Sequence, residues 1–441
     1  MTRRIVLVDF YWTRDKDPRV PLGHASLYAA LAARTDADIR RLAFPVNAMK
    51  RDIEGIADAV LEAAADSSPD ATDVALGAYV WAEEIIQGLL PLLRRRGFTG
   101  RVILGGPQVT YAGTGLDQIY PDADLFVRGY GEDALCRLVQ NVDPSQIDGV
   151  HVVGTPDVCL QSRIELDALP SPWLSGLIPL VDQPFIRWET QRGCMFRCAF
   201  CQHREAGKRL ERRALNNSRL LREIDLFCES DVQEIAILDP VFNANEQGTQ
   251  VLERFVERGF SGRLSLQCRA EMITDEFLDA ARQLDVCLEF GLQTVHRKEQ
   301  AVIRRNNAMS IVDETFRRVR ALGIDFEVSL IFGLPDQTVE SFEESIDWCL
   351  QRQVPVIKAF PLMLLRGTAL ERRRAEWRLV EDGSAMPTVI SSSTFSESQW
   401  GEMARLSEAL LVTEGAHPST IAALSKLATE QQILRDRWQP G

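Results

Sequence analysis

Short apolar runs alternate with amphipathic stretches along most of this 441-residue chain. This alternation is typical of parallel strands, because the connection between two parallel strands must cross the sheet and is usually a helix. The first part has five strand-like runs, at 4–10, 38–43, 73–79, 101–105 and 124–127, with helical stretches near 24–34, 49–65, 82–96 and 131–140. We therefore expect an α/β domain over residues 1–148 with a parallel sheet covered on both faces.

A second alternation follows a proline-rich linker at 149–184. Its six strand-like runs lie at 185–189, 234–238, 263–267, 286–290, 325–330 and 356–360, with helices at 216–229, 249–258, 274–283, 311–321 and 339–351. Six units are too few for a closed eight-unit barrel and predict an open, partial (β/α)6 barrel over 185–370. A small mixed C-terminal region follows at 371–441, with helices near 400–414 and 417–436. The five units of the first domain suit a flavodoxin-like (Rossmann-like) doubly wound sheet.

Composition limits the partners of the chain. The formal net charge of −13 argues against a nucleic-acid partner, which needs a clustered basic surface. No apolar run approaches the roughly 20 residues of a membrane helix, and the amino terminus lacks the cleavage site of a signal peptide. Six of the nine cysteines are scattered singly, as is typical of thiols in a reducing compartment. We therefore expect a cytoplasmic protein with no membrane partner.

The other three cysteines, Cys194, Cys198 and Cys201, follow the first strand of the predicted barrel in the pattern C-x3-C-x2-C. Three thiolates leave one iron of a [4Fe–4S] cluster without a protein ligand, and that iron is open to a small molecule. A Cys3His zinc site that adds His203 is the alternative. Zinc ligands usually come as two separated pairs that staple a small fold, so the spacing favours the cluster.

The cysteine segment resembles the signature of the radical S-adenosylmethionine (SAM) superfamily, with Phe200 as the aromatic before the third cysteine. The resemblance implies reductive cleavage of SAM to a 5′-deoxyadenosyl radical, with an external electron donor of the flavodoxin or ferredoxin type. The strand ends in ILDPVFNAN, LQCRAE and LEFGLQT are similar to SAM-contacting segments of the family. The SAM-binding residues that the resemblance implies are Phe200, Asp239, Asn243, Gln267, Arg269, Glu271 and Gln293. A polar side chain at a strand end can instead cap a helix or turn.

A doubly wound domain before such a barrel resembles the cobalamin-dependent radical SAM enzymes. Glycines in LGGPQVTY and VRGYGEDAL would let backbone approach a flat ligand. None of the five histidines stands in the Asp-x-His-x-x-Gly pattern that places a histidine under cobalt in some cobalamin proteins. The alternative is a domain that has kept the fold and lost the cofactor. The residues implied for cobalamin binding are Tyr79, Val80 and Trp81 at the lower face, with Gly105, Gly106, Pro107, Gln108, Gly129, Gly131 and Glu132.

With both cofactors, the resemblance implies cobalamin-dependent methylation of a small molecule, and we expect an intermediate of a specialised metabolite. Three alternatives stay open. One is radical rearrangement or cyclisation with cobalamin present but no methyl transfer. Another is transfer of the 3-amino-3-carboxypropyl group of SAM without cobalamin. The third is a non-enzymatic metal-binding scaffold. No pattern in the chain assigns a catalytic side chain beyond the cluster ligands.

Overall fold

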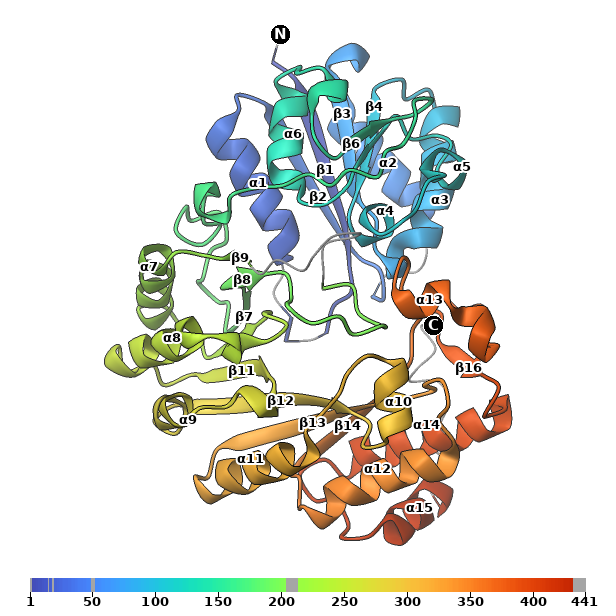
Figure 1. The fold of residues 1–441 in the computed structure, drawn as a ribbon. Helices are drawn as coiled ribbons and strands as arrows, with labels where there is room; N and C mark the ends of the chain where they lie inside the picture. Colours follow the sequence, from blue (N-terminus) through green and yellow to red (C-terminus); the bar gives the residue numbers. More distant parts are fainter. Residues whose placement is uncertain (1, 15, 18–19, 49–51, 204–212, 431–441) are drawn as a thin grey trace. The chain divides into compact units, whose positions relative to one another are not determined.

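The computed structural model describes residues 2–14, 16–17, 20–48, 52–203 and 213–430 (Figure 1). These residues form two compact units, and the division between them falls after Pro179. Each unit has its own six-stranded sheet.

The first unit contains a six-stranded sheet in the order β2-β1-β3-β4-β5-β6. Its first five strands are parallel, which confirms the doubly wound arrangement expected from the sequence. The sixth strand was not expected, and it pairs antiparallel with the fifth. It is only three residues long, too short to show any alternation, and it lies within the stretch expected to be a linker. The strands are β1 (Arg4–Tyr11), β2 (Asp38–Pro45), β3 (Thr72–Gly77), β4 (Arg101–Gly105), β5 (Leu125–Val127) and β6 (Val150–Val152).

Helices cover both faces of this sheet, with α1 and α6 packed together on one side and α2 and α3 on the other (Figure 1). The central strands accordingly contain runs of buried apolar residues, as in Ile5–Val8 of β1. Two short helices, α4 and α5, follow β4 at the carboxyl edge of the sheet. The helices are α1 (Leu22–Arg34), α2 (Ile53–Ala64), α3 (Glu83–Arg95), α4 (Pro107–Thr110), α5 (Leu116–Ile119) and α6 (Gly131–Val139).

The second unit contains six parallel strands in sequential order, β7-β10-β11-β12-β13-β14. This order confirms the partial barrel. In β11 and β12 every second residue is fully buried under the helices, while the others are half-buried on the inner face. The strands are β7 (Phe185–Trp188), β10 (Glu234–Ile237), β11 (Arg263–Cys268), β12 (Asp285–Gln293), β13 (Asp325–Phe332) and β14 (Val356–Pro361).

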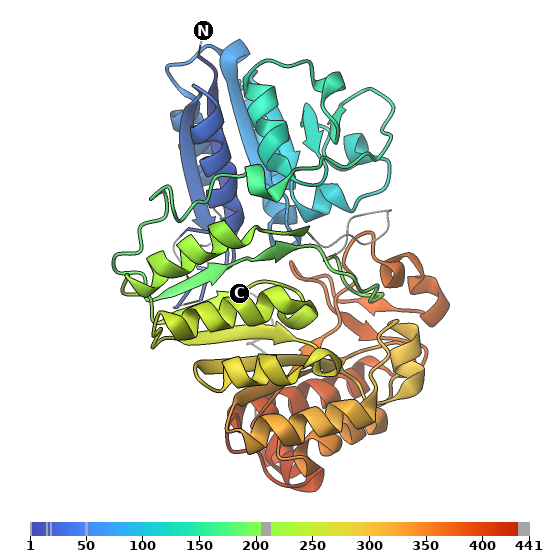
Figure 2. The same cartoon turned by 60° about the vertical axis from the view of Figure 1, so that its left-hand side comes forward.

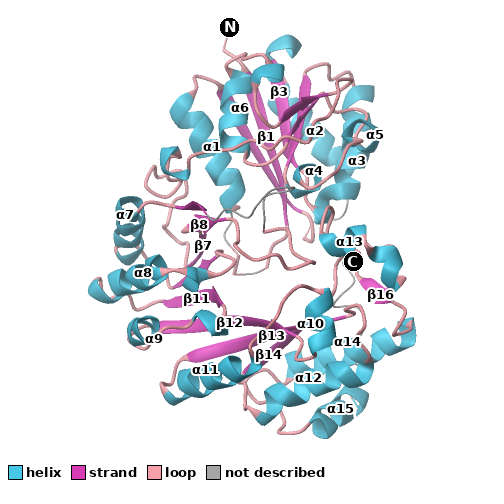
Figure 3. Cartoon of the chain, in the orientation of Figure 1, coloured by secondary structure: helices cyan, strands magenta, loops and turns pink. Residues whose placement is uncertain are grey.

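The outer face of this sheet is covered by a row of helices, seen from the side in Figure 2. The row consists of α7 (Asn217–Cys228), α8 (Glu246–Glu257), α9 (Asp275–Ala281), α11 (Met309–Ala321) and α12 (Val339–Gln351). A short helix that the sequence did not indicate, α10 (Arg297–Val302), follows β12 (Figure 3).

The C-terminal region adds a small hairpin and two helices to the second unit. Helix α14 (Glu397–Val412) packs against β14, and α15 (Ile421–Glu430) packs on α14. The expected helix at 417–436 extends beyond residue 430, outside the described residues. The hairpin pairs β15 (Val380–Glu381) with β16 (Val389–Ser391), after the short helix α13 (Ala369–Arg372).

Within the described ranges, no helix combines the length and the apolar character needed to cross a membrane. All nine cysteines lie in these ranges, and all are free thiols.

Candidate active site

Cys194, Cys198 and Cys201 lie on one loop at the carboxyl end of β7. The loop begins after the two-residue strand β8 (Gln191–Arg192), which pairs with β9 (Arg213–Ala214). Its middle is held from two directions. The Ala199 N–H donates to the carbonyl of Ile303 at 2.7 Å, and the Ala199 carbonyl accepts from the N–H of Leu370 at 2.9 Å.

Each of the three sulfur atoms faces an N–H donor. The backbone N–H of Phe196 lies 3.5 Å from Cys194 Sγ, and that of His203 lies 3.4 Å from Cys201 Sγ. The Arg305 guanidinium donates to Cys198 Sγ at 3.7 Å through Nη1. Donors placed in this way stabilise thiolates, which are the metal-binding form of cysteine.

Burial opposes that ionisation in the protein alone. It raises the pKa of the Cys194 thiol and raises the pKa of Cys201 to about 11. A bound cation reverses this balance, because metal binding displaces the thiol proton. The loop therefore suits a cationic metal group better than it suits free thiolates.

The arrangement bears on the choice between zinc and a cluster. Among the described residues, no group of three histidine, cysteine or carboxylate side chains is arranged to hold a single metal ion. A tetrahedral zinc site requires its ligands to converge on one ion. The thiolates of a cubane cluster have no such requirement, since each binds a different iron. The preference for a cluster over a Cys3His site that includes His203 therefore rests on the spacing of the three cysteines.

Asp239 anchors the chain just before the cysteine loop. Its carboxylate accepts the N–H groups of Thr190 at 2.9 Å and Gln191 at 3.2 Å, and also the Thr190 hydroxyl. The side chain is fully buried, and burial raises the pKa of Asp239 to about 7. Both carboxylate oxygens are thus committed to the neighbouring strand end, and the arrangement favours a positioning role over the SAM contact expected from the sequence.

Asn243 and Arg269 form a second fixed point, between β10 and β11. The Asn243 amide donates to the carbonyl of Arg269 and accepts from its N–H, both at 2.9 Å. The Arg269 guanidinium lies 4.2 Å above the ring of Phe196 in the cysteine loop and 3.3 Å from Glu271. Asn243 therefore holds Arg269, and Arg269 in turn holds the loop.

The remaining SAM candidates are spread along the inner face and the edge of the sheet. Gln267 is half-buried on β11 and lies opposite Glu289 of β12. Gln293 ends β12 with a positive φ of 70°, at a register irregularity that begins at Gly291. Phe200 is half-buried within the cysteine loop. The Glu271 carboxylate accepts the backbone N–H of Ala308 at 3.3 Å, in addition to its contact with Arg269.

Arg305 belongs to this site, although the sequence did not single it out. Besides Cys198, its guanidinium donates to the Gly291 carbonyl, and its buried Nε has no partner among the described residues. It lies on the loop after α10, and only the fold brings it beside a cysteine 107 positions away.

In the first unit, Tyr79 and Trp81 form a stacked pair at the carboxyl end of β3. Their ring centroids are 4.8 Å apart and nearly parallel, at 4°. The Trp81 indole N–H donates to the carbonyl of Phe10 at 2.8 Å, which fixes the pair to the end of β1. Val80 begins the 3-10 turn that contains Trp81. The pair therefore presents two nearly parallel rings, one of which is fixed by a hydrogen bond to the backbone.

The turn after β4 lies against Ala78, the residue that precedes Tyr79. Gly106 has a φ of 90°, and a Cβ there would come within 2.8 Å of the Ala78 carbonyl oxygen. The N–H of Gln108 donates to the same carbonyl at 3.0 Å, while its side-chain amide donates to Glu83 at 3.1 Å. Gly105 ends β4 and Pro107 begins α4. Close backbone approach therefore requires glycine at 106.

The third expected segment starts α6. Gly129 has a φ of 82°, and its N–H donates to the Thr110 hydroxyl at 3.0 Å. Gly131 is the first residue of α6. Glu132 is buried and accepts the hydroxyl of Ser26 at 2.8 Å, so its carboxylate pins α6 to α1. Gly129 packs against Ser162, whose carbonyl oxygen would lie 2.6 Å from a Cβ at position 129, and Glu132 has a packing role between the two helices.

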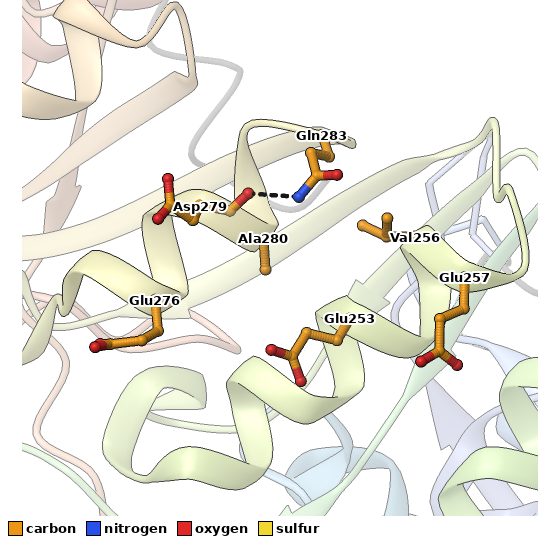
Figure 4. Close-up of a pocket in the computed structure, with 7 residues that line it drawn as sticks. All are labelled: Glu253, Val256, Glu257, Glu276, Asp279, Ala280 and Gln283. Carbon is orange, nitrogen blue, oxygen red and sulfur yellow. Dashed lines mark hydrogen bonds between the residues drawn. The ribbon is translucent and has the colours of Figure 1, made fainter.

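A groove on the outer helices lies away from all of these residues. It runs between α8 and α9 and is lined by four carboxylates together with Val256, Ala280 and Gln283 (Figure 4). It contains no thiol and no cationic side chain. The four carboxylates belong to Glu253, Glu257, Glu276 and Asp279.

Comparison with known proteins places this geometry in context. Residues 188–349 match the family model described as the radical SAM superfamily. Over most of its length the fold resembles the solved structure of the radical SAM methyltransferase TsrM from Kitasatospora setae, described with cobalamin and a [4Fe–4S] cluster bound. The TM-score is 0.68 at 17% identity, over 91% of this chain and 81% of that one.

Two curated relatives are similar in sequence. The first is the 2-(S-pantetheinyl)-carbapenam-3-carboxylate methyltransferase of Streptantibioticus cattleyicolor, 26% identical over 76% of this chain and 50% of its own length. The second is the cobalamin-dependent radical SAM methyltransferase TokK of Streptomyces tokunonensis, 27% identical over 68% of this chain and 46% of its own length. The chain thus spans about half the length of the curated relatives it matches.

Proposed function

Because this chain belongs to the radical SAM superfamily, we propose that it is an enzyme that cleaves SAM at a [4Fe–4S] cluster and uses cobalamin to methylate a small molecule. The observation that carries the proposal is the loop of three cysteines at a strand end, each with an N–H donor at its sulfur. The names of the relatives support a small-molecule substrate. The net negative charge of the chain argues against a nucleic acid as substrate.

Cys194, Cys198 and Cys201 would hold the cluster. When bound, such a cluster supplies the electron that splits the sulfonium of SAM. The protein contributes position and charge. The Arg305 guanidinium donates to Cys198. The Arg269 guanidinium, at the end of β11, packs on the ring of Phe196 in the cysteine loop. Asn243 fixes the backbone of Arg269, and Asp239 anchors Thr190 and Gln191 just before the cysteine loop.

The carboxyl edge of the first unit suits cobalamin. The stacked Tyr79–Trp81 pair offers a flat face, and the turn at Gly105–Gly106 offers backbone without side chains. When bound, cobalamin supplies a methyl group to the substrate. The histidines of this unit are engaged elsewhere: His151 contacts Asp117 at 2.7 Å, and His24 is buried beside Arg41. This supports binding with no histidine beneath the cobalt.

Several finer predictions are part of this proposal. We propose an external reductant of the flavodoxin or ferredoxin type and a substrate from specialised metabolism. The free state of all nine cysteines supports action in a reducing compartment such as the cytoplasm. We also propose the division into a cobalamin-binding domain at 1–148, a linker at 149–184, a barrel at 185–370 and a C-terminal region at 371–441.

Cysteine variants test the proposal. Replacing Cys194, Cys198 or Cys201 by alanine should abolish both the iron–sulfur absorption and the release of 5′-deoxyadenosine from SAM under anaerobic reduction. The matched control is His203→Ala on the same loop, which should leave both intact. Cleavage that survives in the cysteine variants would refute the cluster assignment, and loss of metal in His203→Ala would restore the zinc site. Release of methylthioadenosine instead would indicate transfer of the aminocarboxypropyl group.

A further inference from the structure

Among the described residues of the first unit, Arg128 has the most deeply buried arginine side chain. It follows β5 directly, and only 1% of it is exposed. Its guanidinium donates to the carbonyls of Val109 at 2.8 Å, Ala112 at 2.6 Å and Gly113 at 2.9 Å. It also forms an ion pair with Asp157 at 2.5 Å. The guanidinium thus joins the segment after β4 to the segment after β6.

Burying an arginine costs folding free energy unless its N–H groups find hydrogen-bond acceptors. The carbonyl acceptors of Arg128 lie in and just after helix α4. Helix α4 is a single turn, so its last carbonyls have no partner within the helix. Arg128 donates to the carbonyl of Val109 within the helix and to those of Ala112 and Gly113 just beyond it. Without it, the carbonyls of the buried residues Val109 and Ala112 would lose this donor, and so would that of Gly113.

The other end of α4 is fixed by the backbone at the end of β3. The N–H of Gln108 donates to the Ala78 carbonyl at 3.0 Å, and the Ala78 N–H donates to Gly105 at 2.7 Å. The Thr110 hydroxyl of α4 accepts the N–H of Gly129, the residue after Arg128. Arg128 therefore controls where α4 lies, and α4 carries the turn at Gly106.

We propose that Arg128 is a positioning residue that holds the turn at 105–108 in the shape that accepts cobalamin. This inference rests on the proposed cobalamin function. Arg128 need not touch the ligand, because it acts through α4. Asp157 is its counter-charge and carries a smaller share of the effect, since the three carbonyl bonds persist without it.

Arg94 provides a matched control in the same sheet. Its guanidinium donates to the carbonyls of Phe98 at 3.1 Å, Gly100 at 2.9 Å and Asp122 at 3.0 Å, and to the Asp124 carboxylate at 2.6 Å. The bonding matches that of Arg128, three carbonyls and one aspartate. These partners precede β4 and β5, so Arg94 works at the amino edge of the sheet, away from the ligand turns.

The test compares Arg128→Gln, Asp157→Asn and Arg94→Gln in the full chain. Hydroxocobalamin affinity is measured by absorption titration, alongside iron content and thermal melting. Arg128→Gln should weaken cobalamin binding by about tenfold or more, as loss of a supporting contact does at other cofactor sites, with iron content unchanged. Asp157→Asn should weaken binding less. Arg94→Gln should lower the melting temperature and leave affinity within about twofold of the unaltered chain.

Unchanged affinity in Arg128→Gln would overturn the inference, and so would an equal loss in Arg94→Gln, which would indicate general destabilisation. If Arg128→Gln fails to fold, the cobalamin affinities of Asp157→Asn and Arg94→Gln are compared instead. The inference then requires a weaker affinity in Asp157→Asn than in Arg94→Gln. An unaltered chain that carries iron but binds no cobalamin would instead refute the proposed cobalamin function, so the two failures are distinguishable.

Discussion

Asp239 offers a test of how the cysteine loop is held. Its carboxylate is fully buried and accepts two backbone N–H groups on one oxygen and the Thr190 hydroxyl on the other. Asp239→Ala would leave these three donors buried without a partner. Each such loss costs about 1–3 kcal/mol, so we expect the variant to lose about 3–5 kcal/mol of stability in the second unit.

Asp239→Asn should behave very differently. The amide oxygen can still accept both backbone N–H groups, and its NH2 can donate to the Thr190 hydroxyl, which then turns to act as an acceptor. The pKa of Asp239 is raised to about 7 by burial, so below that pH the native residue is already largely neutral. We therefore expect a change within about 1 kcal/mol for Asp239→Asn near pH 6.

Hydrogen exchange and urea denaturation of the apo protein measure the two effects together. Asp239→Ala should lose protection at the amides of Thr190 and Gln191 and unfold at lower urea, and it should take up less iron on reconstitution. Asp239→Asn should keep the protection of both amides. The reasoning is refuted if the two variants differ by less than about 0.5 kcal/mol, because the carboxylate would then not be the anchor.

Three further perturbations follow from the geometry. Burial raises the pKa of Asp9 to about 6 from 3.8, so the folded first unit binds the proton more tightly and loses up to about 3 kcal/mol of stability as the pH rises from 4 to 6. Asp9→Asn should reduce this dependence of stability on pH in urea titrations at several pH values. Arg305→Gln removes the charged donor to Cys198 and should make the cluster potential more negative by on the order of 60–130 mV. A redox titration followed by electron paramagnetic resonance measures the shift, and Arg304→Gln, at the exposed neighbouring residue, should change the potential little. Gly106→Ala forces a Cβ against the Ala78 backbone at a φ of 90° and should lower the first thermal transition by the equivalent of about 1–3 kcal/mol; an unchanged melt would contradict the close packing.

The strands could be predicted because each is a short apolar run bounded by polar residues, and both sheets have the order that such alternation favours. The strand Arg101–Gly105 has the predicted limits. The strand Val150–Val152 escaped notice because three residues carry no period, and it depends on pairing with Phe126 and its neighbours in β5. A short edge strand is specified by its partner more than by its own residues.

The site was predictable only where the chemistry is local. Three cysteines within eight residues are recognisable in the sequence as a metal-binding motif. Arg305 lies in a polar stretch, and it joins the site only because the fold brings the Ile303 carbonyl into contact with the cysteine loop. Asp239 is a SAM candidate in the sequence because its segment, ILDPVFNAN, resembles a SAM-contacting segment of the family. Its hydrogen bonds to Thr190, 49 positions earlier, exist because β7 and β10 pair in parallel. No local sequence pattern indicates them.

The iron, cobalt and zinc content after anaerobic reconstitution tests the central claim most directly. The full chain is purified without oxygen, supplied with iron, sulfide and hydroxocobalamin, desalted, and analysed for iron, cobalt and zinc together with its absorption spectrum. The account predicts about four irons and one cobalt per chain, with iron lost in Cys198→Ala and cobalt retained. About one zinc per chain without iron would contradict the cluster, and iron without cobalt would contradict the role proposed for the first unit.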